Sequence, residues 1–67
     1  MDYDFEIMWC DVVNNKILTM EIGIGADGRP VYKVAVLKGG RSVGTIYDDL
    51  SIAVATYKMM KRVIWTI

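Results

Sequence analysis

Histidine is absent from this chain of 67 residues, which also has only one cysteine and one proline. Without histidine, the chain lacks the most common general base and the most common metal ligand, which excludes most catalytic and zinc-binding arrangements. Cys10 cannot form an internal disulfide, and we expect it to be a small buried hydrophobic residue rather than a nucleophile. The sequence therefore predicts a protein that is not an enzyme and needs no metal ion or cofactor.

Long hydrophobic runs are missing as well. The longest stretch without a charged residue is residues 50–57, whereas a membrane-spanning helix needs about 20 apolar residues. Three of the first six residues are acidic and none is basic, whereas a secretory signal would begin with basic residues, and small secreted domains usually carry several cysteines. We therefore expect a cytoplasmic protein without a membrane partner, in the host cytoplasm if the protein is viral.

The charges cancel in total but are unevenly distributed. Residues 1–28 hold six acidic residues and one lysine, whereas residues 29–67 hold seven basic and two acidic residues. Such an asymmetry suggests an interaction surface of one sign. Hydrophobic residues make up 54% of the chain, and a domain this small buries only about 60% of its unfolded surface. The surplus predicts a homo-oligomer or another partner interface.

Three turn signals divide the first 47 residues into four segments. The pairs Asn14-Asn15 and Gly39-Gly40 suit two-residue hairpin loops, and residues 26–28 suit a three-residue loop ending in glycine. The predicted cross-strand pairs include Phe5 with Ile24, Ile7 with Ile22, Trp9 with Met20, Met20 with Val34, Glu21 with Lys33, and Val34 with Thr45.

All three turns assign the same side chains to one inner face of the sheet, which supports the register. That face is predicted to contain Phe5, Ile7, Trp9, Leu18, Met20, Ile22, Ile24, Tyr32, Val34, Val36 and Val43. The outer face mixes charged and apolar residues, and an apolar outer patch commonly marks an interface. Its predicted contact residues are Met8, Val12, Ile17 and Leu37.

After Tyr47 the hydrophobic period changes from two residues to about 3.6, which predicts a helix. Asp48 or Asp49 is expected to cap its N-terminus. One apolar stripe is expected to pack on the sheet: Leu50, Val54, Tyr57, Met60, Ile64 and Ile67. A second stripe exceeds what one sheet face covers and is a competing interface: Ile52, Ala55, Met59 and Val63.

The predicted fold is α+β, a four-stranded antiparallel meander with one C-terminal helix packed on one face in two layers. The strands are expected at about residues 3–13, 16–25, 31–38 and 42–47, and the helix at about residues 49–65. No linker or internal repeat divides the chain, so we expect a single small domain.

Residues 23–28 satisfy the G-x-G-x-x-G pattern of dinucleotide-binding folds. That site needs glycines that open a helix within a β-α-β unit, so that the helix N-terminus meets the pyrophosphate. Here Arg29-Pro30 and another strand follow at once, and we interpret the segment as a hairpin.

The segments Gly28-Arg29-Pro30-Val31-Tyr32-Lys33 and Val43-Gly44-Thr45-Ile46 precede the expected helix. With its order of four strands and a helix, the chain resembles the single-strand-binding domain of the positive-cofactor-four type of transcriptional coactivator. The resemblance covers most of the chain through element order and hairpin residues, not through a specific motif. It implies a dimer that binds single strands, although the zero net charge departs from a strongly basic binder.

Five cations and one aromatic residue form the predicted nucleic-acid site: Lys38, Arg41, Lys58, Lys61, Arg62 and Trp65. Cations of this kind contact backbone phosphates, and a tryptophan can stack on a base. The leading functional prediction is a non-enzymatic module that binds single-stranded DNA or RNA. The alternative is a protein-binding adaptor or inhibitor of phage or viral type, which would use the apolar outer sheet face.

Overall fold

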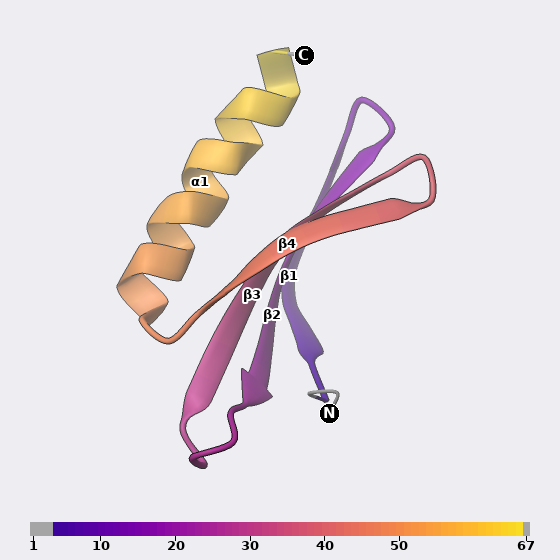
Figure 1. The fold of residues 1–67 in the computed structure, drawn as a ribbon. Coiled ribbons are helices and arrows are strands. Elements are labelled where there is room, and N and C mark those ends of the chain that lie inside the picture. Colours follow the sequence, from indigo (N-terminus) through magenta and orange to yellow (C-terminus); the bar gives the residue numbers. More distant parts are fainter. Residues whose placement is uncertain (1–3, 67) are drawn as a thin grey trace.

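Four antiparallel strands and one C-terminal helix make up the fold (Figure 1). The computed structural model describes residues 4–66, the last two by their backbone alone. The elements are β1 (Glu6–Val13), β2 (Lys16–Ile24), β3 (Pro30–Lys38), β4 (Arg41–Tyr47) and α1 (Leu50–Thr66). The strands form one sheet in the order β1-β2-β3-β4, with α1 on one face. The predicted α+β meander with a C-terminal helix is confirmed.

The three predicted turns are present, with the backbone conformations that their residues favour. Positive φ angles occur at Asn14 (51°), Asn15 (63°), Gly28 (82°), Gly39 (58°) and Gly40 (79°). Two-residue hairpins require such angles, and asparagine and glycine tolerate them. The loop at residues 26–28 is closed by the Gly25 amide, which donates to the Arg29 carbonyl at 2.7 Å. The pairings of β2 with β3 and of β3 with β4 match the predicted register.

β1 contains a bulge at Met8, which reverses the faces of the residues before it. After the bulge the predicted register holds, but before it Ile7 lies opposite Glu21 instead of Ile22. Ile7 is accordingly on the outer face, where it is 63% exposed. Phe5 is on that face too, since the ammonium group of Lys33 lies 4.9 Å from the centroid of its ring. The inner positions predicted for both residues are wrong, because a bulge inserts one unpaired residue while the apolar alternation of the sequence continues.

The core lies between α1 and the two central strands. Its buried hydrophobic residues are Val13, Leu18, Met20, Tyr32, Val34, Ala53, Tyr57 and Ile64. Ala53 has no exposed surface, and its small side chain allows the helix to approach the sheet closely. Leu50 was expected in this stripe but is 44% exposed, because it is the first residue of the helix and lies past the end of β4. Ile67, also predicted to pack there, lies outside the described residues.

Asp49 caps the N-terminus of α1. Its Oδ1 atom accepts hydrogen bonds from the Ser51 amide at 2.8 Å, the Ser51 hydroxyl at 2.6 Å and the Ile52 amide at 3.3 Å. These bonds, led by the one from the Ser51 hydroxyl, lower the pKa of the Asp49 carboxyl. Of the two N-terminal caps that the sequence allowed, Asp49 is the one used, and α1 begins at the next residue.

Candidate functional site

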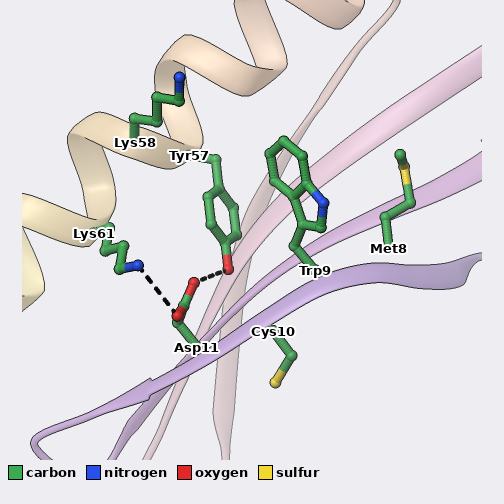
Figure 2. Close-up of a pocket in the computed structure, with 7 residues that line it drawn as sticks. All are labelled: Met8, Trp9, Cys10, Asp11, Tyr57, Lys58 and Lys61. Atoms are coloured by element: carbon green, nitrogen blue, oxygen red, sulfur yellow. Dashed lines mark hydrogen bonds and ion pairs between the residues drawn. The ribbon is translucent and has the colours of Figure 1, made fainter.

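An open groove of about 480 Å³ lies between the edge strand β1 and the helix α1. It is lined by Met8, Trp9, Cys10, Asp11, Tyr57, Lys58 and Lys61 (Figure 2). The bulge in β1 shapes one wall, since it allows the consecutive side chains of Met8 and Trp9 to point to the same side while Cys10 points to the other. We call this feature the β1–α1 groove.

The floor of the β1–α1 groove is a polar contact between strand and helix. The Tyr57 hydroxyl donates a hydrogen bond to Oδ2 of Asp11 at 2.5 Å, and the Lys61 ammonium lies 3.4 Å from Oδ1 of the same carboxylate. The Leu18 carbonyl lies 3.5 Å from the same hydroxyl. Tyr57 is buried and Asp11 half-buried, so the contact closes the bottom of the groove and fixes the helix over the strand.

This contact holds both groups in defined protonation states. The hydrogen bond from Tyr57, followed by the contacts with Lys61, lowers the pKa of the Asp11 carboxyl despite partial desolvation. Burial, reinforced by the neighbouring carboxylate, raises the pKa of the Tyr57 hydroxyl. Asp11 is therefore a carboxylate and Tyr57 a neutral hydroxyl at neutral pH, which leaves Tyr57 as the donor.

The upper part of the groove combines an aromatic surface with positive charge. Trp9 is 41% exposed, and its ring meets that of Tyr57 edge-on, with centroids 5.3 Å apart and an interplanar angle of 65°. Lys58 is exposed above them, and its ammonium group points away from Asp11 (Figure 2). No ion pair joins Lys58 to another described side chain, whereas the charge of Lys61 is partly neutralised.

The structure divides the predicted nucleic-acid residues into two groups. Lys58 and Lys61 line the β1–α1 groove, and Arg62 is exposed one turn of helix from Lys58. Lys38 and Arg41 are paired at the β3–β4 turn, on the side of the sheet that lies away from β1. The side chain of Trp65 lies outside the part of the chain that the structure describes.

The outer face of the sheet has no covering element among the described residues, because α1 occupies the inner face. Of the predicted outer contact residues, Val12 is 69% exposed, Leu37 is 37% exposed and Ile17 is half-buried. Met8 was also expected there, but the bulge turns it into the β1–α1 groove. Cys10 was expected to be buried and is instead exposed, because β1 is an edge strand.

The second helix stripe is also exposed, on the flank of α1 that faces β4. Ile52 is 51% exposed, Met59 58% and Val63 43%. The predicted interface residues thus lie on two separate surfaces, the outer sheet face and this flank of the helix.

Asp11, Tyr57 and Trp9 were not predicted from the sequence to form one site. A signal was nevertheless present, since strand alternation places Asp11 between Trp9 and Val13 on the face that packs against the helix. A carboxylate on such a face needs a hydrogen-bonding partner. Tyr57 on the helix is that partner. The pairing of Tyr57 with Asp11 can be predicted only when the position of the helix on the sheet is known.

Two features are absent from the described residues. No helix there is both long enough and apolar enough to cross a membrane. No group of three or more cysteine or acidic side chains, within that same part of the chain, is arranged to hold a metal ion. Comparisons of the chain with known protein families, curated proteins and solved structures gave no match.

Proposed function

We propose that this protein is a non-enzymatic binding module for single-stranded nucleic acid and that the β1–α1 groove is its binding site. The observation that carries the proposal is the placement of an accessible indole, that of Trp9, beside Lys58 in one open groove. A base stacks on an exposed aromatic ring, and the adjoining phosphate pairs with a cation. The proposal includes a cytoplasmic location, which suits a chain with a single exposed cysteine.

The charges around the groove assign separate roles to its cations. Asp11 offsets Lys61, so Lys61 chiefly holds the floor in place. Lys58 and Arg62 are both exposed and lie four residues apart, on neighbouring positions of one helix face. Lys58 and Arg62 are therefore the phosphate contacts of the proposal. The nucleic-acid strand runs along the helix with one base turned toward Trp9.

The test is a fluorescence anisotropy titration with a labelled single strand of about ten nucleotides, within the range that one small module covers. We expect binding at low salt that weakens roughly tenfold between about 50 mM and about 200 mM salt, as two or three phosphate contacts would give. Lys58→Ala and Arg62→Ala are each expected to weaken binding and reduce the salt dependence. Arg29→Ala is the matched control, because it removes a cation from the β2–β3 loop.

An absence of binding at tens of micromolar protein would contradict the proposal. An equal loss of affinity in the Arg29→Ala control would also contradict it, because the attraction would then depend on total charge rather than on the groove.

A second candidate is a protein-binding adaptor that uses the outer sheet face. The observation that favours it is the group of exposed apolar residues on that face, to which the bulge adds another: Ile7, Val12, Leu37 and Ile46. Exposed apolar patches rimmed by charges are typical of protein interfaces. Val12→Asp would abolish partner binding on this account while leaving the fold intact, which affinity capture together with circular dichroism would measure.

A further inference from the structure

A third surface is formed by β4 and the adjoining flank of α1, and it is distinct from the groove and from the outer face. β4 is poorly covered: every residue from Arg41 to Ile46 is exposed, and Val43 on the inner face is 75% exposed. The reason is the position of the helix, whose buried residues contact the central strands rather than the edge. We call this surface the β4–α1 face.

The phase of the helix places an apolar ridge on the β4–α1 face. Thr56 and Met60 line a hollow with residues of β3 and β4, which shows that this flank of the helix faces β4. Ile52 and Met59 lie four residues before and three residues after Thr56, so they are on the same flank. Val63, one turn further, extends the row, and all three members of the ridge are substantially exposed.

A hollow of about 130 Å³ accompanies the ridge on the same face. It is lined by Val34, Val36, Val43, Gly44, Thr45, Tyr47, Thr56 and Met60. A surface that holds both a ridge and a hollow suits a two-fold interface, in which the ridge of each copy can be set against the hollow of the other.

The β4–α1 face differs from the other surfaces in charge, and this difference favours it as the site for a second copy. Identical copies bring identical charges together, so a self-associating face must avoid a concentration of one sign. The ridge and the lining of the hollow contain no charged residue. By contrast, the opposite flank of the helix carries the cations of the groove, and β1 carries Glu6 and Asp11 together with a bulge that interrupts its edge.

The dimensions of the β4–α1 face are those of a small dimer interface. A helix of 17 residues is about 25 Å long and about 10 Å wide, and a seven-residue strand is about 24 Å long. Together they give a footprint of roughly 25 by 15 to 20 Å on each copy, or about 750–1,000 Å² over both copies, which is the size of a weak, readily dissociating interface and below the ~1,200–2,000 Å² of standard dimers. We infer that the β4–α1 face is a two-fold interface with a second copy of this chain.

In this dimer the β1–α1 groove remains open, because it lies on the opposite flank of α1. The free edge of β4 adds a second contribution, since it contains no acidic residue and pairs regularly with β3 along its whole length. Unpaired backbone groups on such an edge are available to the second copy. The inference does not depend on a nucleic-acid ligand, and its test uses the protein alone.

The test is the mass in solution, measured by light scattering over a range of concentrations under reducing conditions, because Cys10 is exposed. Wild-type protein is expected to approach twice the 7.6 kDa mass of one chain and to dissociate on dilution. Met59→Lys and Val43→Lys are expected to weaken association by about tenfold or more, since they place like charges across the two-fold axis. Circular dichroism checks that each variant is folded.

Val12→Lys is the matched control, because Val12 is a similarly exposed residue on the outer face at the opposite edge of the sheet. It is expected to remain dimeric. A wild-type protein that stays monomeric at millimolar concentration would overturn the inference. Loss of the dimer in Val12→Lys but not in Met59→Lys would overturn it as well, and would assign self-association to the outer face. If Val43→Lys does not fold, Met59→Lys on the exposed helix flank decides the question.

Discussion

The hydroxyl of Tyr57 donates a hydrogen bond to the carboxylate of Asp11 at 2.5 Å, and so links the helix to an edge strand 46 positions earlier in the chain. This contact joins α1 to β1 at the floor of the groove in which Trp9 and Lys58 are found.

The Asp11–Tyr57 contact predicts a component of acid sensitivity. The pKa of Asp11 is lowered from its usual 3.8 in the folded protein, so the stabilisation is present above pH 3.8 and is lost as the pH falls through the folded-state pKa. Asp11→Asn is expected to lose less stability than wild type between neutral pH and pH values below 3.8. Urea denaturation at both pH values, followed by circular dichroism, measures the difference.

The contribution of Asp49, whose pKa is lowered in the same direction, remains in Asp11→Asn and serves as an internal reference. Equal losses for the two proteins would contradict a role for Asp11 in acid unfolding. Tyr57→Phe removes the donor and is expected to lower the free energy of unfolding by about 1 kcal/mol at neutral pH.

Substitution of Gly44 tests the close contact between β4 and Ala35 of β3. A Cβ atom at this position would lie 2.8 Å from the Cβ of Ala35 and 3.0 Å from the Val34 carbonyl oxygen. Gly44→Ala is therefore expected to destabilise the protein by about 1–3 kcal/mol, as overpacking does. Ala35→Gly in the same chain should recover part of this loss, and strictly additive effects of the two substitutions in urea denaturation would rule out the contact.

The β1–β2 turn gives a prediction about backbone conformation. Asn15 has a φ angle of 63°, a region that costs β-branched residues most. Asn15→Gly is expected to be neutral or slightly stabilising, whereas Asn15→Val should cost about 1–2 kcal/mol. Asn14→Gly also removes a hydrogen bond, because the side-chain amide of Asn14 donates to the Ile64 carbonyl at 3.4 Å near the end of the helix. Thermal melts of the three variants would reveal this order.

The bulge at Met8 predicts very different losses of stability for two apolar residues that the sequence placed on the same inner face. Leu18 has no exposed surface, and Leu18→Ala should cost about 2–5 kcal/mol. Ile7 is 63% exposed, and Ile7→Ala should change stability by less than about 0.5 kcal/mol. A large loss for Ile7→Ala would mean that β1 pairs without the bulge.

The turn residues explain why so much of the fold could be predicted. Asn14-Asn15, residues 26–28 and Gly39-Gly40 each allow few loop geometries, and together they fix the register from Trp9 to Tyr47. The bulge could not be predicted, because Met8 and Ile7 are both apolar and either register leaves an apolar residue facing the helix. A bulge depends on the twist of the assembled sheet rather than on a local sequence signal.

The candidate site could be predicted only in part, for a related reason. The cations at positions 58, 61 and 62 follow from helical spacing, but the aromatic wall of the groove comes from Trp9 on β1, 49 positions before Lys58 in the sequence. Which flank of the helix faces β1 depends on how the helix packs on the sheet, with Ala53, Tyr57 and Ile64 buried against it. That choice brings Lys58 to Trp9 and leaves Met59 on the opposite flank.

The central claim is that a base of a single strand stacks on Trp9, and tryptophan fluorescence tests it most directly. In a Trp65→Phe variant Trp9 is the only tryptophan, so its emission reports on the groove alone. Addition of an unlabelled single strand is expected to quench this emission in a saturable manner at low salt, and Lys58→Ala in the same background should weaken the effect. Unchanged Trp9 emission at strand concentrations that shift the anisotropy of a labelled strand would contradict the account.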